Sequence, residues 1–384
     1  MHVITPEDVV ADAVSVAELA RSNADPRGHE LGDHLATELV AAARAAGLFR
    51  MCLASELGGL RVPLPTAIEI IEDLAYADGS LGWCVAVANI AASRLAFIDE
   101  AEARVVAAEP DKLIIAGTFP PYGRGRRTAD GYELSVRCTF ASGCTAATWF
   151  VGGIMAEQAD GTSTPLIAYF PASQGRIVRN WDVIGLRATG SHDVVADNVT
   201  VPAGRTTMTL GGPRWSADPI SAVPFLGFTA LVAAVPLGIA RHAMTELTTV
   251  AAGKTAFGQQ QTLINDPVFQ GRFAAVLARL RAARDFLFHR ADAVWQQAQD
   301  GALTAEARAS VLLAVGEAGQ AALAAARFAH EAVGTTSIRT DSMLTRCLND
   351  VVVATRHVSF SPTAGQVAGR VALGLPPASP FWED

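Results

Sequence analysis

The stretch WDVIGLRATGSHDVVADNVTVPAGR, residues Trp181–Arg205, contains the most informative pattern in this chain of 384 residues. Its second half, from His192 onward, is rich in β-branched residues and ends at a proline and a glycine, which predicts a β-strand followed by a turn. Its first half contains Gly185 and Gly190, which indicate turns before that strand. The stretch therefore predicts the end of a β region.

Outward from this stretch, short β-branched runs occupy residues 113–212. They are KLIIAGTF (112–119), YELSVRC (132–138), WFVGGIM (149–155) and PLIAYF (165–170). Asp-Gly pairs at 130–131 and 160–161 separate some of these runs and favour hairpins. We therefore predict a small antiparallel barrel or sandwich here, with residues 120–127 (PPYGRGRR) as a solvated turn.

The regions on both sides of the β region have helical periodicity. Residues Thr66–Ala77 place apolar side chains three and four positions apart. Residues Asp266–Asp300 and Leu303–Val333 are long and rich in alanine, which is typical of closely packed helices. The predicted fold is multidomain α+β: an N-terminal helical domain (1–112), a central β domain (113–212) and a C-terminal four-helix bundle (213–384).

Composition excludes several classes of function. The net charge of −8 is unsuited to binding phosphates of nucleic acid, and no apolar run reaches membrane-spanning length. Five cysteines without paired spacing predict a reduced cytoplasm and no zinc site. No strand followed by G-x-G-x-x-G is present, so we expect no nicotinamide site in this chain.

Several segments together resemble the acyl-CoA dehydrogenase superfamily. Residues 181–205 resemble its G-[LM]-R-x-T-G-S-x-D-V…V-x-V-P segment, and residues 236–243 (PLGIARHA) resemble the start of its helical bundle. Residues 254–258 (KTAFG) are similar to its R-x-x-F-G segment, with lysine in place of arginine. Residues 331–357 resemble a late segment that ends in Arg-Asp, with Asn349 in place of the arginine.

The resemblance covers nearly the whole chain and implies flavin contacts that are shared between subunits. It implies that Lys254, Phe257 and Gly258 reach the flavin of a neighbouring subunit, and that Gly334 and Thr335 also bind flavin. A homotetramer is the assembly that such sharing implies.

The glutamate that acts as the base in the dehydrogenases is missing from both family positions. Counting eight residues from Asp350 gives Val358, and counting eight residues back from Pro236 gives Phe228. No acidic residue lies between Asp350 and Glu383. We therefore expect no removal of a proton α to a thioester.

The flavin-dependent monooxygenases that resemble this family have a histidine seven residues after the same aspartate, and here it is His357. The resemblance implies that His357 and Ser142 are catalytic, that Ser142, Gly143 and Trp83 contact the flavin, and that Trp83, Asn89 and His357 contact the substrate. It implies that a separate flavin reductase supplies reduced FMN or FAD. It further implies that the reduced flavin would react with oxygen through a C4a-hydroperoxyflavin and hydroxylate an aromatic or similar small substrate.

Two alternatives stay open from the sequence. One is an acyl-CoA dehydrogenase or oxidase with a base from an unexpected position. The other is a family member without flavin that serves as a binding or scaffold subunit. The residues do not choose between FMN and FAD, and they do not name the substrate.

Overall fold

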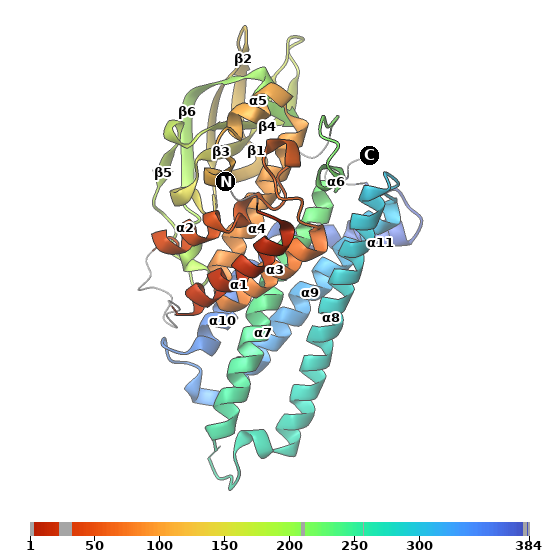
Figure 1. Cartoon of the computed structure of the whole chain (residues 1–384). Helices are drawn as coiled ribbons and strands as arrows, with labels where there is room; N and C mark the ends of the chain where they lie inside the picture. Colours follow the sequence, from red (N-terminus) through yellow and green to blue (C-terminus); the bar gives the residue numbers. More distant parts are fainter. Residues whose placement is uncertain (1–3, 23–32, 209–211, 256, 379–381, 383–384) are drawn as a thin grey trace.

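The computed structural model describes residues 4–22, 33–208, 212–255, 257–378 and 382. Along the sequence, a first group of helices is followed by a sheet and then by a second group of helices (Figure 1). The N-terminal helices are α1 (Pro6–Ser22), α2 (Thr37–Ala45), α3 (Leu64–Ala77), α4 (Gly79–Ser93) and α5 (Glu100–Val106). The predicted order of helical, β and helical regions is confirmed.

The β region forms a seven-stranded sheet with the order β5-β6-β2-β1-β3-β4-β7. Its strands are β1 (Ile115–Arg127), β2 (Gly131–Cys138), β3 (Trp149–Glu157), β4 (Ser163–Pro171), β5 (Arg176–Val178), β6 (Asp193–Pro202) and β7 (Thr206–Met208). Neighbouring strands are antiparallel except for the central pair β1 and β3, which is parallel. The predicted β domain is thus present, as a mostly antiparallel sheet.

The segment 120–127 differs from its expected form. It is the second half of β1 and not a solvated turn, because residues 124–127 pair with residues 132–135 of β2. The pairing of β1 with β3 shifts register between Thr118 and Gly123. Pro120 and Pro121 lie in this interval and lack the N–H groups that a regular ladder needs, so the strand bulges there and then continues.

Both faces of the sheet are buried, because successive side chains of a strand point to opposite faces. Phe150 and Phe170 pack with side chains of β2 and β6 in one cluster. Val151 and Tyr169 pack with the segment around Leu95 on the other face. The Tyr169 hydroxyl also donates to the carbonyl of Ala91 at 2.9 Å, which fixes α4 against the sheet.

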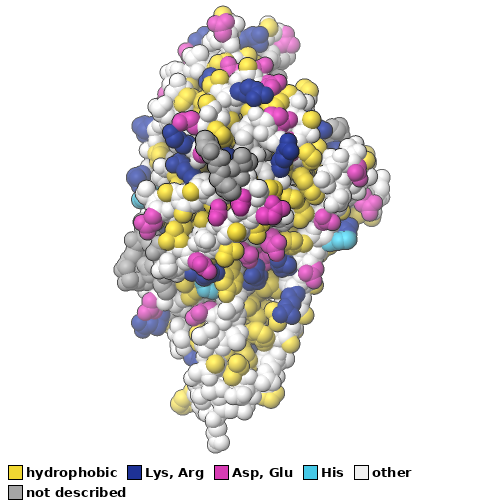
Figure 2. Space-filling view, viewed as in Figure 1, with side chains coloured by type: hydrophobic (Ala, Val, Ile, Leu, Met, Phe, Trp, Pro, Cys, Tyr) yellow, Lys and Arg dark blue, Asp and Glu magenta, His cyan; other side chains and the backbone are white. Residues whose placement is uncertain are grey.

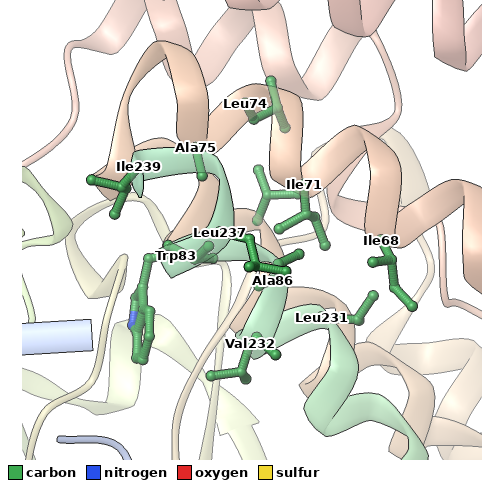
Figure 3. Close-up of a cluster of buried hydrophobic side chains, with 14 of the residues drawn as sticks. Ile68, Ile71, Leu74, Ala75, Trp83, Ala86, Leu231, Val232, Leu237 and Ile239 are labelled. Atoms are coloured by element: carbon green, nitrogen blue, oxygen red, sulfur yellow. The ribbon is translucent and has the colours of Figure 1, made fainter. Parts of the chain in front are cut away.

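The C-terminal helices are α6 (Pro219–Ala222), α7 (Thr229–Gly253), α8 (Pro267–Gln299), α9 (Ala305–Ala332), α10 (Met343–Ala354) and α11 (Pro362–Ala372). Helices α7–α10 pack as a bundle, and α7 also packs along α3. Figure 3 shows the shared core, where Ile71 of α3, Ala86 of α4 and Leu231 of α7 meet. The N-terminal and C-terminal helices therefore share one core, and the domain limits of 1–112, 113–212 and 213–384 stay predictions.

By length and composition alone, three helical segments could cross a membrane: 79–97, 225–253 and 305–332. Within the fold, 89%, 78% and 61% of their apolar windows are buried. On the face in Figure 2, acidic and basic side chains are interspersed over the upper and middle parts. The lower end, formed by the α7–α8 connection, shows mostly hydrophobic and uncharged groups.

Candidate active site

Ser142 lies in a tight turn between β2 and β3. The turn needs left-handed backbone at Phe140 (φ 58°) and at Gly143 (φ 74°), and glycine adopts that conformation without strain. The N–H of Gly143 donates to the carbonyl of Thr189 at 2.7 Å, and the N–H of Ala141 donates to the carbonyl of His192 at 3.0 Å. These bonds hold Ser142 beside the stretch 186–192, half-buried.

Trp83, on the second turn of α4, meets Ser142. Asp78 begins this helix by accepting a hydrogen bond from the N–H of Leu81 at 2.9 Å. The Trp83 indole is 8% exposed, and its Nε1–H donates to Ser142 Oγ at 3.0 Å. The indole also contacts the ring of His357 edge-on, with ring centroids 5.5 Å apart and an interplanar angle of 77°.

His357 follows α10 and begins the short helix 358–360. Its Nδ1 accepts a hydrogen bond from the N–H of Ser359 at 3.3 Å and lies 3.0 Å from Ser359 Oγ. Because Nδ1 is an acceptor, the proton of the neutral ring is on Nε2. Burial lowers the pKa of His357 to about 4, so the ring is neutral at pH 7. Nε2–H is then a hydrogen-bond donor with no protein partner among the described residues.

Asp350 lies seven residues before His357, and its carboxylate connects three segments of the chain. Its carboxylate accepts from the N–H of Leu186 at 2.5 Å and lies 3.6 Å from Arg346, which also contacts Asp78 at 2.6 Å. Burial raises the pKa of Asp350 to about 6, against the effect of Arg346. A side chain at Gly185 would lie 2.4 Å from the backbone of Asn349. The stretch 181–205 is thus held against α10 and α4.

Large apolar side chains are exposed next to these polar groups. Phe140 is 68% exposed and contacts Trp181 edge-on at 6.0 Å, while Ile184 is 65% exposed and Val358 is 60% exposed. They lie within two residues of Ser142, Leu186 and His357, respectively. Exposed apolar surface beside a few oriented polar groups fits a flat aromatic cofactor such as flavin.

Both positions at which a dehydrogenase would have its base are apolar in the structure. Val358 is exposed beside His357, and Phe228, in the short helix 225–228, is 1% exposed. In the described part of the chain, no group of three or more His, Cys, Asp or Glu side chains is arranged to hold a metal ion.

Asn89 does not join the Ser142 group. Its side chain is fully buried, and its carbonyl oxygen accepts from the N–H of Cys52 at 2.9 Å. Its amide donates to the carbonyls of Leu48 at 2.7 Å and Val85 at 2.9 Å. These bonds fix α4 to the segment 48–52, so the structure gives Asn89 a structural role and no visible contact for a substrate.

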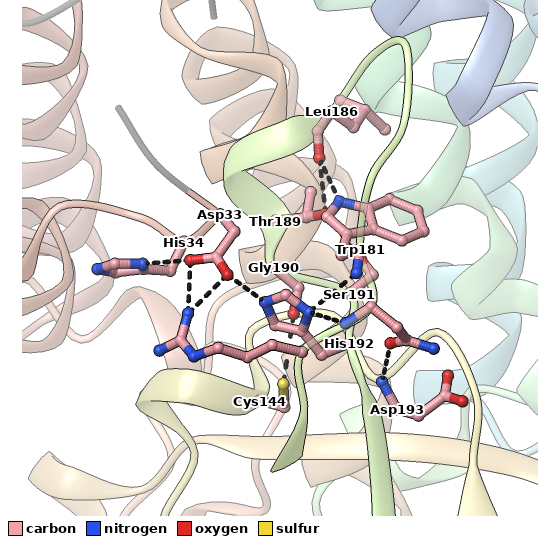
Figure 4. A network of polar contacts seen from close by, with 12 residues as sticks. Asp33, His34, Cys144, Trp181, Leu186, Thr189, Gly190, Ser191, His192 and Asp193 are labelled. Carbon is pink, nitrogen blue, oxygen red and sulfur yellow. Dashed lines mark hydrogen bonds and ion pairs between the residues drawn. The ribbon is translucent and has the colours of Figure 1, made fainter. Parts of the chain in front are cut away.

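The structure also shows what His192 does. Figure 4 shows its ring 3.0 Å from Asp33 through Nε2, while Nδ1 accepts from the N–H groups of Asn180 and Trp181, each at 3.1 Å. Hydrogen bonds from Arg179 and His34 hold the pKa of the Asp33 carboxyl well below its usual range. This buried histidine therefore orients the start of the 181–205 stretch.

The other predicted flavin contacts lie in a different part of the molecule. The C-terminal end of α7 and the α7–α8 connection form the lower end in Figure 1, far from the sheet. There Lys254 Nζ donates to Thr336 Oγ1 at 2.5 Å, beside the short helix 334–336. Phe257 is fully exposed, and Gly258, Gly334 and Thr335 are exposed as well. The structure brings these residues near one another but not near Ser142.

Two site residues were not predicted from the sequence. Ser142 Oγ lies 2.7 Å from Ser191 Oγ, which lies 2.7 Å from Thr189 Oγ1. Both residues belong to the T-G-S segment at 189–191. The sequence alone did not single them out, because a hydroxyl residue next to a glycine is by default a turn residue.

Comparisons with known proteins show the family of this chain. Residues 9–101 match the family model described as the N-terminal domain of acyl-CoA dehydrogenase, and residues 230–362 match the C-terminal domain. An indole-3-acetate monooxygenase of Pseudomonas putida is 31% identical over 90% of this chain and 88% of its own length. The chain belongs to the acyl-CoA dehydrogenase family.

Within the family, the relatives are oxygenases. A FADH(2)-dependent resorcinol hydroxylase, oxygenase component, of Rhizobium sp. is 28% identical over 97% of this chain and 96% of its own length. The solved structure of XiaF from Streptomyces sp. in complex with FADH2 and glycerol superposes with a TM-score of 0.89 and 22% identity, covering 98% of this chain and 97% of that one. That likeness confirms the fold.

Proposed function

We propose that this protein is the oxygenase component of a two-component flavin-dependent monooxygenase that hydroxylates an aromatic substrate. It would take reduced FMN or FAD from a separate reductase and act in the cytoplasm. The relatives at 31% and 28% identity support this proposal, because their names describe a monooxygenase and a FADH(2)-dependent hydroxylase that act on aromatic compounds. The absence of a carboxylate at Val358 and Phe228 supports it against dehydrogenation.

One observation is central to the proposal: Trp83, Ser142 and His357 come from three distant parts of the sequence and meet at one place. Each presents a different function there. Trp83 fixes the Ser142 hydroxyl by a hydrogen bond at 3.0 Å, and His357 offers a neutral Nε2–H. Around them, Phe140 and Val358 present exposed apolar surface. A flavin ring would bind with Ser142 beside its N5 edge.

When bound, the reduced flavin supplies two electrons to dioxygen, so that one oxygen atom enters the substrate and the other leaves as water. The side chains would bind, orient and exclude water. The apolar side chains at 140 and 358 would keep bulk water from the reacting oxygen. His357 Nε2–H would donate a hydrogen bond to that oxygen or to a phenolic oxygen of the substrate, and its low pKa keeps it from acting as a cation at pH 7.

The far end of α7 would complete the flavin site of a neighbouring subunit. In Figure 1 the far end of α7 and the α7–α8 connection lie well below the sheet and α4, which favours a role toward another subunit's flavin for Lys254, Phe257, Gly258, Gly334 and Thr335. The Phe257 side chain is fully exposed, and other apolar side chains of the helical region are also exposed: Val268, Phe286, Leu313 and Ile338. We propose a homotetramer in which these groups are covered by partner subunits.

The decisive experiment is an anaerobic titration of the protein with reduced FMN and reduced FAD, followed by oxygen and an aromatic substrate. Indole-3-acetate and resorcinol are the first substrates to test. We expect micromolar or tighter binding of one reduced flavin, and a product heavier by one oxygen atom that contains ¹⁸O when the gas is ¹⁸O₂.

The alternatives predict different outcomes in the same experiment. Turnover of a saturated acyl-CoA with an artificial electron acceptor, above a blank of free flavin, would indicate a dehydrogenase. Binding of neither reduced flavin would indicate a scaffold or binding subunit. Hydrogen peroxide as the only oxygen product with a broad panel of aromatic compounds would count against the proposed hydroxylation.

A further inference from the structure

A continuous row of hydrogen bonds connects Trp83 to the backbone of Leu186. Trp83 Nε1–H donates to Ser142 Oγ at 3.0 Å, and Ser142 Oγ lies 2.7 Å from Ser191 Oγ. Ser191 Oγ lies 2.7 Å from Thr189 Oγ1, which donates to the carbonyl oxygen of Leu186 at 2.7 Å. Figure 4 shows Thr189 bonded to Leu186 at the far end of this row, with Ser191 nearby. We call it the hydroxyl row.

Both ends of the hydroxyl row have fixed polarity. An indole N–H can only donate, and a backbone carbonyl can only accept. Each hydroxyl has one hydrogen. The Thr189 hydroxyl donates its hydrogen to the Leu186 carbonyl, so Thr189 must accept from Ser191. Ser191 must then accept from Ser142. Ser142 Oγ therefore accepts from Trp83 and donates to Ser191. Its remaining lone pair can accept a hydrogen bond from a ligand, but the hydroxyl has no hydrogen left to donate.

Reversing the row costs one hydrogen bond. If Thr189 donated to Ser191 and Ser191 to Ser142, the Ser142 hydrogen would be available to a ligand, but the bond from Thr189 to Leu186 would be lost. That carbonyl would keep its bonds from Trp181 Nε1 at 3.2 Å and from the N–H of Thr189 at 3.1 Å. One such bond corresponds to roughly a two- to twelvefold change in an equilibrium.

Solvent has little access to the middle of the row. Thr189 is 1% exposed and Ser191 is 4% exposed. Water molecules therefore have little room to supply or accept the hydrogen that a reversal would displace. Backbone bonds also fix the two sides of the row, because the carbonyl of Thr189 accepts from the N–H of Gly143 at 2.7 Å.

We propose that Ser191 and Thr189 are positioning residues that make the site prefer reduced flavin to oxidised flavin. This inference rests on the proposed function, in which Ser142 lies beside flavin N5. In reduced flavin N5 has a hydrogen and donates, which suits a Ser142 that can only accept. In oxidised flavin N5 has a lone pair, so two acceptors face each other unless the row reverses. The preference lets the protein take up reduced flavin in the presence of the oxidised form.

The test compares dissociation constants for reduced and oxidised flavin, with both FMN and FAD, in the wild type, Ser191→Ala and Thr189→Val. Either substitution frees the Ser142 hydrogen, so the ratio of the oxidised to the reduced constant should fall roughly two- to twelvefold. In the same variants the midpoint potential of the bound flavin should fall by roughly 10–30 mV, since tenfold corresponds to about 30 mV for two electrons. Neither readout depends on turnover.

Two control variants separate the hydroxyl row from general loosening. Thr189→Ser keeps the hydroxyl, so its ratio should stay within about twofold of the wild type. Ser93→Ala removes a buried hydroxyl that donates to the carbonyl of Ile90 at 2.8 Å, on the same helix as Trp83 but outside the row, and it should also leave the ratio unchanged.

The outcomes are distinguishable from failure of the proposed function. A wild type that binds no reduced flavin would overturn the proposed function itself. A wild type that binds both redox forms equally, or a ratio that is unchanged in Thr189→Val, would overturn only the role of the hydroxyl row. Valine matches threonine in shape, so Thr189→Val alone decides the matter if Ser191→Ala does not fold.

Discussion

Two groups of predicted flavin contacts lie in different parts of this molecule, one where the sheet meets the helices and one at the far end of α7, and they differ in how complete they are within one chain. At the sheet end, Ser142 is held by Trp83 and backed by buried hydroxyls. At the other end, Lys254 contacts Thr336, but Phe257 is fully exposed. The first group is oriented by its own chain. In the second group, Phe257 is not packed against a surface of its own chain in the part that the structure describes.

This difference indicates that one group of residues determines the reactivity of the flavin ring and the other determines cofactor affinity. The polarity of a hydrogen bond to the flavin ring requires rigid donors and acceptors, and the buried core around α4 and the 186–192 segment supplies them. Affinity for the rest of the cofactor needs only surface area and charge, which a neighbouring subunit can supply. We therefore expect substitutions at the sheet end to change chemistry, and substitutions at the far end to change affinity and assembly.

The largest effect is expected for His357→Ala. Loss of one positioned donor typically lowers the rate of the affected step by about 10²–10⁴-fold, so hydroxylated product per flavin oxidised should fall steeply while oxygen consumption continues. Reduced-flavin affinity should stay within about threefold. Product and hydrogen peroxide measured in the same single-turnover reaction give the result.

His289→Ala is the matched control, because His289 is exposed on α8 and outside the site. It should couple oxygen to product as the wild type does. If His357→Ala also coupled oxygen consumption to product as the wild type does, His357 would have no part in oxygen transfer. Ser142 would then be the remaining candidate for that role.

The second prediction concerns the pH dependence of stability. The pKa of His357 is about 4 in the folded protein and near 6.5 when unfolded, so the unfolded state binds the proton first. His357 therefore contributes stability that is present above pH 6.5 and is lost as the pH falls through 4. Against His357→Gln, the wild type should lose about 1.5 kcal/mol more between pH 6.5 and pH 5.

Urea unfolding at several pH values measures this difference. Asp350 acts in the opposite direction, because its pKa is raised to about 6 and its contribution is lost as the pH rises through that value. Comparing each wild-type value with His357→Gln at the same pH removes this common background. Parallel stability curves for the two proteins would show that His357 is not buried enough to resist protonation.

The sequence named His357 and Ser142 as site residues, but it did not reveal the hydroxyl groups behind Ser142. The family resemblance implied that His357 and Ser142 share a site, and in the structure both contact Trp83. Ser191 and Thr189 could not be found this way, because a hydroxyl next to a glycine is by default a turn residue and only the folded turn shows that it faces Ser142. The resemblance implied that Asn89 contacts the substrate. In the structure Asn89 lies six residues after Trp83 along α4 and bonds the segment 48–52.

The β region shows the same limit. The runs of β-branched residues located most strands, but the parallel pairing of β1 with β3 depends on long-range contacts that local periodicity does not contain. Residues 120–127 were expected as a turn because of their prolines and glycines. Pairing with β2 overrides that local preference once the bulge has absorbed the prolines.

The smallest effect is expected at the far end, for Phe257→Ala. Phe257 is fully exposed, so removal of its ring should leave secondary structure and the unfolding of the isolated chain unchanged. If a neighbouring subunit covers it, the substitution should weaken reduced-flavin binding and tetramer association by roughly two- to fivefold, the size of losing one partly buried aromatic contact.

Tyr122→Ala is the control, since Tyr122 on β1 is 69% exposed and outside both groups. Light scattering at micromolar concentration and flavin titration report the two quantities separately. A wild type that is monomeric, together with unchanged flavin affinity in Phe257→Ala, would mean that the far end has no role in cofactor binding and that the sheet end binds flavin alone.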